Sequence, residues 1–176
     1  TFNPIHLGHV TAARCAVEML KLDRLYLIPD GRPPHKNLDD NSPLPEDRME
    51  MVRLAAESMG LGDVVRVSDL EMKRKGKSYT VDTIQAVREK YPKDEIYLLM
   101  GTDMFLTFQA WKDPDKIAKL CRLCAFGRSE TDTESLFAVQ RAYLHKTFGA
   151  KVTTIALPNL VEISSTALRR RLADLS

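Results

Sequence analysis

Two histidines, His6 and His9, stand three residues apart in TFNPIHLGHV, the first stretch of the chain. Asn3-Pro4 is typical of a turn, and from Gly8 onward apolar residues recur at helical spacing, so His9 is expected in a first helical turn and His6 just before it. The amide groups of such a turn carry a partial positive charge that suits phosphate and disfavours a charged imidazole. Both rings are therefore expected to be neutral donors until a polyphosphate binds. The alternative is a pair of solvated loop histidines.

The stretch ISSTALRRRL, Ile163 to Leu172, offers a second anion site by the same physics. Three hydroxyls stand at its start and a cation follows about one turn further in; these residues are Ser164, Ser165, Thr166 and Arg169. The alternative is a plain N-cap followed by a basic, solvated face. Arg170 and Arg171 are expected to be solvated in either case.

The longest irregular stretch runs roughly from Gly31 to Leu44 and is rich in Pro and Asn, so we expect a mobile flap over an active site. Lys36 lies in this stretch, within PPHK. Its ammonium group is expected to neutralise the far end of a triphosphate. The alternative is a solvated lysine.

The elements that must position these residues follow from the hydrophobic pattern. Helices are expected over Gly8–Leu20, Pro45–Met59, Tyr79–Lys90, Asp103–Phe108, Pro114–Leu120, Glu134–Phe148 and residues 164–175. Strands are expected over Leu25–Pro29, Val64–Val67, Glu95–Met100 (a central strand), 122–127 and 152–157. This alternation predicts an α/β fold: a Rossmann-like, doubly wound parallel sheet with helices on both faces, in a single domain over residues 1–176.

In such a sheet, ligands bind at the carboxyl ends of the strands, where strand order reverses. Four stretches follow expected strands at that edge: TFNPIHLGH, PDGRPPHK, GTDMF and the approach to ISST. We therefore expect them to meet in one crevice.

The composition is that of an ordinary globular protein, with 176 residues, 44% hydrophobic and 28% charged, and a formal net charge of +2. This charge is too small for a protein that coats a polyanion, and the basic run Met72–Lys77 is interpreted as a solvated connector. No apolar run approaches the ~20 residues that span a bilayer. We therefore expect neither nucleic acid nor a membrane as a partner.

Three cysteines, of which Cys121 and Cys124 form the pair in CRLC, do not make a disulfide framework. A zinc knuckle would need a second pair, and Cys15 with His145 is a poor substitute, so ordinary buried or semi-buried thiols are expected. Such thiols fit a reducing compartment, and we expect a cytoplasmic protein.

TFNPIHLGH resembles the nucleotidyltransferase signature, which is usually written with two glycines before the Thr-Phe and closes on His-x-Gly-His. Pantetheine-phosphate adenylyltransferases, cytidylyltransferases and class I aminoacyl-tRNA synthetases share that motif. PPHK, SYTVDT, GTDMF followed by Trp111, and ISSTALR then resemble, in this order, the bacterial nicotinate-nucleotide adenylyltransferases over essentially the whole chain. The family's first strand and glycine pair do not precede Thr1, so roughly eight to ten further residues are expected there, a short apolar strand ending in Gly-Gly.

The resemblance implies that ATP and nicotinate mononucleotide give nicotinate adenine dinucleotide and pyrophosphate, a step of NAD biosynthesis, by direct in-line attack. It implies that His6 and His9 are the catalytic donors around the reacting α-phosphorus. It further implies ATP or phosphate contacts from Thr1, Phe2, Lys36, Ser164, Ser165, Thr166 and Arg169. Mg²⁺ is expected to be held mainly by the ATP phosphates, with no metal ligand from the chain.

The resemblance places the mononucleotide against Thr80, Thr83, Gly101, Asp103 and Trp111. Asp103 can accept two hydrogen bonds from ribose hydroxyls; the alternative is a helix N-cap. Trp111 can stack on the pyridine ring; the alternative is an aromatic at the edge of the core. Thr80 and Thr83 lie at a helix start whose amides can meet a carboxylate, which favours nicotinate over nicotinamide.

Two other hypotheses stay open. One is a related adenylyltransferase that uses nicotinamide mononucleotide or phosphopantetheine. The other is a nucleotide-binding module without catalysis. The sequence also leaves the oligomeric state open, a homo-oligomer included.

Overall fold

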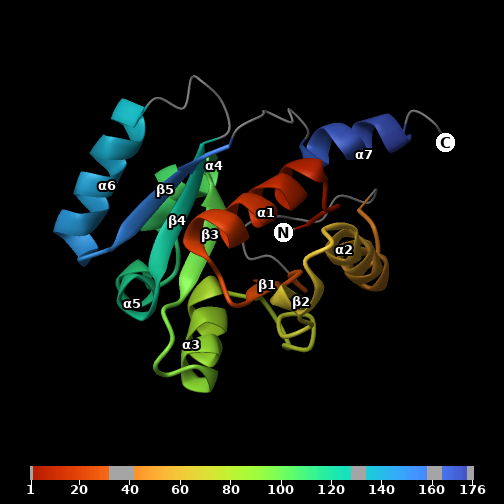
Figure 1. The fold of residues 1–176 in the computed structure, drawn as a ribbon, viewed down its shortest axis with the longest axis horizontal. Coiled ribbons are helices and arrows are strands. Elements are labelled where there is room, and N and C mark those ends of the chain that lie inside the picture. Colours follow the sequence, from red (N-terminus) through yellow and green to blue (C-terminus); the bar gives the residue numbers. More distant parts are fainter. Residues whose placement is uncertain (1, 32–41, 128–133, 158–163, 174–176) are drawn as a thin grey trace. The chain divides into compact units, whose positions relative to one another are not determined.

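The computed structural model describes residues 2–31, 42–127, 134–157 and 164–173. By their contacts, the residues form two compact units, one of Thr1–Ser78 with Val161–Ser176 and one of Tyr79–Leu160 (Figure 1). The expected flap falls almost wholly on residues 32–41, outside the described ranges. Within those ranges, no helix combines the length and the apolar character needed to cross a membrane.

The first unit contains α1 (Leu7–Leu20), β1 (Leu25–Leu27), α2 (Pro45–Ser58), a short 3-10 turn (Gly62–Val64), β2 (Val65–Val67) and α7 (Ser165–Ala173). β1 and β2 form a parallel two-stranded sheet, and α2 packs against β2. Proline and two acidic residues open α2, which suits the unbonded amides and the positive end of a helix start. The two strands and the inner faces of α1 and α2 supply the buried apolar side chains: Ala13, Ala16, Leu25, Leu27, Met49, Val52 and Val65.

The second unit contains α3 (Thr80–Lys90), β3 (Tyr97–Gly101), α4 (Thr102–Leu106), a 3-10 turn (Phe108–Ala110), α5 (Pro114–Leu120), β4 (Arg122–Gly127), α6 (Glu134–Phe148) and β5 (Val152–Ala156). The three strands are parallel, in the order β3-β4-β5 (Figure 1). Contacts join α4 to β3 and β4, α5 to β4, and α6 to β5. The largest fully buried side chains of this core are Phe105, Phe108, Ile117, Leu123 and Leu144.

Parallel strands that alternate with helices confirm the α/β class expected from the pattern, and each expected helix and strand is present near its expected bounds. One expectation about strand order is wrong. Glu95–Met100 was expected to be central, but β3 is an edge strand of the described sheet and β4 is its centre. The reason lies in burial: β4 buries four successive residues, Leu123 to Phe126, whereas β3 buries only Met100.

The helical segment expected around Asp103–Phe108 is present as two pieces. α4 stops at Leu106, and a separate 3-10 turn begins at Phe108. Thr107 separates them, because its hydroxyl donates to the carbonyl oxygen of Asp103 at 2.8 Å while its own backbone leaves the helical region. Threonine hydroxyls that bond back to the preceding turn weaken a helix at that point.

The two cysteines of CRLC are buried and free, as expected for ordinary thiols. Burial raises the pKa of the Cys121 and Cys124 thiols to about 12 each. Cys121 also contacts the carbonyl oxygen of Ile117 through its sulfur, at 3.3 Å. At neutral pH both groups are therefore protonated, which makes them poor metal ligands and poor nucleophiles.

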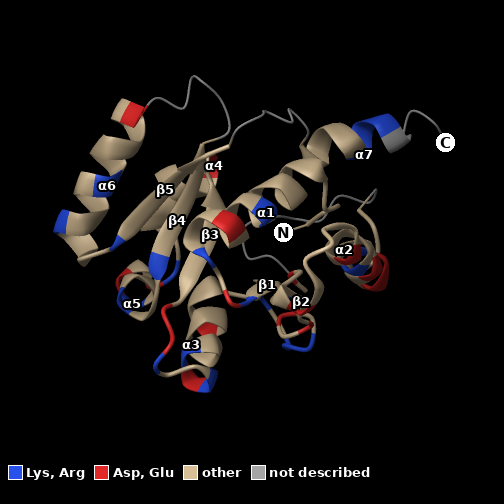
Figure 2. Ribbon diagram, viewed as in Figure 1, with Lys and Arg blue, Asp and Glu red and all other residues tan. Residues whose placement is uncertain are grey.

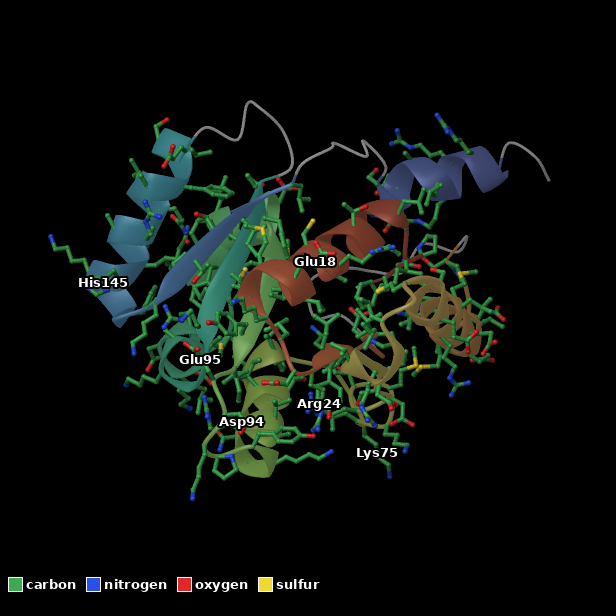
Figure 3. All side chains as sticks on the ribbon, viewed as in Figure 1. Glu18, Arg24, Lys75, Asp94, Glu95 and His145 are labelled. Carbon is green, nitrogen blue, oxygen red and sulfur yellow. The ribbon has the colours of Figure 1, made fainter. Side chains whose placement is uncertain are left out.

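Arg88, in the last turn of α3, is hydrogen-bonded to two other segments of the second unit, the end of α5 and the loop before β3. Its Nε and Nη2 donate to the carbonyl oxygen of Leu120, at the end of α5, at 3.2 and 2.6 Å. Its Nη1 donates to carbonyl oxygens in the loop before β3, where Figure 3 labels Asp94; the acceptors are Tyr91, Pro92 and Asp94. A planar guanidinium group with five N–H donors can serve several carbonyls at once.

Replacing Arg88 by Met is expected to lower the free energy of unfolding by about 2–4 kcal/mol, because a hydrogen bond from a charged group contributes about 1.5–3 kcal/mol and several are lost. Urea unfolding followed by circular dichroism measures this change. Arg141→Met, on the exposed face of α6, is the matched control and should cost less than about 0.5 kcal/mol. Equal stability of the two variants would contradict the role given to Arg88.

Candidate active site

The histidine motif lies at the start of α1 in the first unit. His6 is the N-cap residue, with extended backbone, and His9 is the third residue of the helix. The amides of His9 and Val10 both donate to the carbonyl oxygen of His6, at 2.8 and 3.2 Å. The amides of Leu7 and Gly8 come before the first helical hydrogen bond, so they are the donors that a helix start offers to an anion.

The two imidazole rings are stacked at a slant, with their centroids 3.7 Å apart and their planes at 30°. His9 Nδ1 accepts a hydrogen bond from the His6 amide at 3.2 Å. A neutral imidazole that accepts at Nδ1 carries its proton on Nε2. For a neutral His9 ring the contact therefore assigns the Nε2–H tautomer, and the role of this ring as a donor to phosphate stays a prediction.

The start of α7 contacts the same loop from the other end of the sequence. The Ser165 hydroxyl donates to the carbonyl oxygen of Pro4 at 2.8 Å, and Arg169 Nη1 donates to that of Asn3 at 2.6 Å. Two of the four stretches expected in one crevice, TFNPIHLGH and ISST, are thus brought together. GTDMF lies in the second unit, and PDGRPPHK is described only as far as Gly31.

The serines at the start of α7 differ in role. Ser164 Oγ accepts the amide of Ala167 at 3.1 Å, so Ser164 is the N-cap and the capping alternative is confirmed for it. Thr166 is exposed in the first turn. Arg170 and Arg171 are exposed, as expected, and Figure 2 shows the basic residues gathered toward the C-terminal part of α7.

Phe2 and Asn3 complete the surroundings of the histidines. The Phe2 ring meets His9 edge-on, with centroids 5.1 Å apart, and its backbone lies in the left-handed region with φ of 48°. Asn3 is 6% exposed, and its Nδ2 donates to Ser42 Oγ at 3.0 Å. Sequence reasoning assigned Asn3 only to a turn, and the burial of its side chain is visible only in the structure.

Sequence reasoning also missed a buried ion pair between Asp30, after β1, and Arg48, on α2. Arg48 Nη1 lies 3.1 Å from Asp30 Oδ1, the Arg48 side chain is fully buried and that of Asp30 is 13% exposed. Arg48 Nη2 also donates to the carbonyl oxygen of Gly31 at 3.4 Å. The signal was available, because Arg48 occupies the same helical face as the buried Met49 and Val52. The pair fixes the chain where PDGRPPHK begins.

In the second unit, α3 begins at Thr80, one residue after its N-cap Tyr79. The amides of Asp82 and Thr83 donate to the Tyr79 carbonyl oxygen at 3.1 and 3.4 Å, so those of Thr80 and Val81 precede the helical bonds. Thr83 is buried, with 5% of its surface exposed. Lys112 Nζ lies 4.2 Å from the Tyr79 ring centroid, which adds a cation near this helix start that the sequence did not reveal.

Gly101 ends β3 and is the N-cap residue of α4, so the interpretation of Asp103 as an N-cap is wrong. Asp103 is exposed in the first turn of α4. Thr102, between them, is buried and ties α4 to β4 through a bond from its hydroxyl to the Phe126 carbonyl oxygen at 3.0 Å. Gly101 and Asp103 therefore lie at the carboxyl end of β3, where an α/β sheet binds ligands.

Trp111 is half-buried and packs against the core of the second unit, with its ring centroid 5.4 Å from that of Phe108. This position agrees with the alternative of an aromatic at the edge of the core. Stacking of its other face on a ligand stays a prediction. Two expected site residues, Thr1 and Lys36, lie outside the described residues.

The family model described as cytidylyltransferase-like matches residues 1–171. Two bacterial relatives, each named "probable nicotinate-nucleotide adenylyltransferase", align over nearly the whole chain. The Clostridium tetani protein is 34% identical in an alignment 176 residues long that covers 98% of this chain and 83% of the relative. The Caldicellulosiruptor saccharolyticus protein is 35% identical over 174 residues, which is 99% of this chain and 84% of the relative.

A solved structure shares the fold. Plasmodium falciparum nicotinic acid mononucleotide adenylyltransferase, complexed with NaAD, aligns with a TM-score of 0.78 over 96% of this chain and 78% of that chain. The two sequences are 17% identical, so this likeness concerns the fold, and it confirms the expected fold class.

Replacing Arg48 by Met is expected to lower the free energy of unfolding by about 3–5 kcal/mol, because it leaves the carboxylate of Asp30 without its buried partner. The double variant Asp30→Asn, Arg48→Met should regain part of that loss, since it removes both charges. Chemical denaturation of the wild type, the single variants Arg48→Met and Asp30→Asn and the double variant gives the coupling. Arg53→Met, which breaks the exposed pair with Glu50, is the control and should be nearly neutral. A double variant that loses the sum of both single losses would contradict the pairing.

Proposed function

The chain belongs to the cytidylyltransferase-like family and, within it, to the nicotinate-nucleotide adenylyltransferases, and on this basis we propose that it joins ATP to nicotinate mononucleotide. The products are nicotinate adenine dinucleotide and pyrophosphate, in a step of NAD biosynthesis. One observation of the structure supports the proposal most: His6 and His9 stand at the start of α1 in contact with each other, and α7 is hydrogen-bonded to the loop that carries them.

In this reaction the 5′-phosphate of the mononucleotide attacks the α-phosphorus of ATP in line. One phosphorus–oxygen bond forms while the bond to the β-phosphate oxygen breaks, and pyrophosphate leaves with the electron pair. No protein nucleophile is required, so the chain contributes by positioning the two anions and by stabilising the charge that develops.

The first unit supplies the groups that meet the phosphates of ATP. His9 donates from Nε2–H and His6 acts beside it, toward the oxygens of the α-phosphorus, with the first amides of α1 behind them. The leaving pyrophosphate is held at the start of α7 and by Lys36. The contacts at the start of α7 come from Ser164, Thr166 and Arg169. Thr1 and Phe2 contact ATP from the start of the loop.

The second unit supplies the groups that meet the mononucleotide. Asp103 accepts hydrogen bonds from the ribose hydroxyls beside Gly101, and Trp111 stacks on the pyridine ring. The start of α3, with Thr80 and Thr83, meets the nicotinate carboxylate. A partial positive charge at this helix start favours the anionic acid over the neutral amide.

We propose Mg²⁺ as the ion that accompanies ATP. Among the described residues, no three His, Cys, Asp or Glu side chains are grouped closely enough to hold a metal. The groups at the starts of α1 and α7 are amides, hydroxyls, imidazoles and a guanidinium, most of which donate hydrogen bonds and so fit phosphate oxygens and not a cation. Mg²⁺ then binds the phosphate oxygens, a mode that suits its preference for few protein ligands.

The proposal takes residues 1–176 as one nucleotidyltransferase domain, since the family match runs through both compact units. ATP as substrate and the free cysteines support a cytoplasmic protein.

The function is tested by incubating the purified full chain with ATP, Mg²⁺ and one acceptor at a time. Nicotinate mononucleotide, nicotinamide mononucleotide and phosphopantetheine are compared, and pyrophosphate release and the dinucleotide product are measured. We expect the fastest turnover with nicotinate mononucleotide. Preference for another acceptor would identify a related adenylyltransferase, and ATP binding without pyrophosphate release would identify a binding module.

His9→Ala is expected to lower turnover by about 10²-fold or more, since it removes a preorganised donor to the transition state. His6→Ala should act in the same direction. Steady-state kinetics measure the loss, and circular dichroism checks that the fold is intact. Near-normal turnover of the folded His9→Ala protein would exclude a catalytic role for this residue.

Trp111→Ala is expected to weaken binding of nicotinate mononucleotide by about 1–3 kcal/mol, the usual scale for stacking of a base on an aromatic ring. ATP affinity should hardly change. Titration calorimetry with each ligand separates the two effects, and Trp111→Phe, which keeps an aromatic ring, should retain most of the affinity. Equal losses for both ligands would show that Trp111 acts through packing alone.

A further inference from the structure

We infer that Ser165 is a positioning residue for the two histidines: its hydroxyl, together with Arg169, holds the backbone that carries them. The inference rests on the proposed function for its kinetic consequence. Ser165 then has a role other than direct phosphate contact, which distinguishes it from the neighbouring hydroxyls at the start of α7.

Two hydrogen bonds join α7 to the loop before α1, which is far from it in the sequence. Ser165 Oγ and Pro4 O lie 2.8 Å apart, with a sequence separation of 161. Arg169 Nη1 and Asn3 O lie 2.6 Å apart, with a separation of 166. Ser165 and Arg169 are one helical turn apart on α7, so one face of the helix serves two successive carbonyls of the loop.

The loop needs such support because its backbone is not in a conformation that it would adopt alone. Phe2 has φ of 48°, in the left-handed region, which costs of the order of 1–3 kcal/mol for a residue other than glycine. The strained residue is directly followed by the two whose carbonyls accept from α7. The Asn3 side chain adds a third attachment through Ser42.

The carbonyls that accept from α7 influence the position of the histidines through a short segment of backbone. Pro4 is two residues before His6, and the His6 amide is the group that His9 Nδ1 accepts. Release of Pro4 O frees the peptide groups that aim this amide, and the preference of His9 for the Nε2–H tautomer then weakens. The Ser165 hydroxyl thus orients the proposed donor to the α-phosphate, His9 Nε2–H, without contact with the substrate.

The kinetic test compares Ser165→Ala with Ser165→Thr, which keeps a hydroxyl. A misplaced catalytic group loses rate more than ground-state binding, so Ser165→Ala should lower kcat about tenfold and leave KM for ATP within about twofold. Ser165→Thr should restore most of kcat. Ser58→Ala is the matched control, because Ser58 also donates to a backbone carbonyl, that of Ala55, but within α2; it should leave kcat unchanged.

A second measurement does not depend on turnover. Long-range ¹H–¹⁵N correlation spectra report the tautomer of His9, and they should show Nε2–H in the wild type and a mixture in Ser165→Ala. This readout separates failure of the inference from failure of the proposed function. A wild type that makes no dinucleotide, with a tautomer that still shifts on substitution, would refute the function alone.

Three results would overturn the inference. Ser165→Ala that raises KM for ATP with kcat unchanged would make the hydroxyl a phosphate ligand. Unchanged kcat and tautomer would make it dispensable. A tautomer that shifts equally in Ser58→Ala would make the effect nonspecific. If Ser165→Ala does not fold, Ser165→Cys, which keeps the size and lacks a strong donor, takes its place in all comparisons.

Discussion

The hydrogen bonds to the carbonyl oxygens of Asn3 and Pro4 are the constraint on which the candidate active site in the first unit depends. These oxygens accept from Arg169 and Ser165, so the loop before α1 is held by a helix from the far end of the sequence. Without those bonds, a loop with a left-handed residue and a buried asparagine would have alternatives of similar energy. With them, the histidines, the first amides of α1 and the start of α7 become one set of donors with a fixed geometry.

The helices and strands were predictable because they depend on local pattern. Periodicity of apolar residues, Pro and acidic residues at a helix start, and short apolar runs each indicate one element without knowledge of the others. The expectation that failed, the central position of Glu95–Met100, required a comparison between strands. β3 and β4 both look like buried strands, and only the sheet shows that the residues of β4 are enclosed while those of β3 are half-buried. The end of α4 at Leu106 depended on the direction of one Thr107 hydroxyl, which no spacing reveals.

The candidate site was predictable in its residue types and not in its partners. Ser164 and Ser165 look equivalent in sequence, yet successive positions on a helix point about 100° apart. Ser164 therefore faces the amide of Ala167 and Ser165 faces the loop at Pro4. Arg48 was missed altogether, although it is a charged side chain at a helical position that the apolar pattern marks as buried. A buried charge requires a partner, and in the structure this partner is Asp30.

A reaction without a covalent intermediate leaves the family only position and charge as means of catalysis, and the bond between His6 and His9 serves both. The His9 ring orients the His6 amide by accepting a hydrogen bond from it at Nδ1, and in return this bond favours the proton of His9 on Nε2. An imidazolium has no acceptor, so charging His9 would break this bond within the positive field of the helix start. Under the proposed function the ring meets a phosphate as an oriented donor, and its contribution depends on how firmly the loop behind it is held.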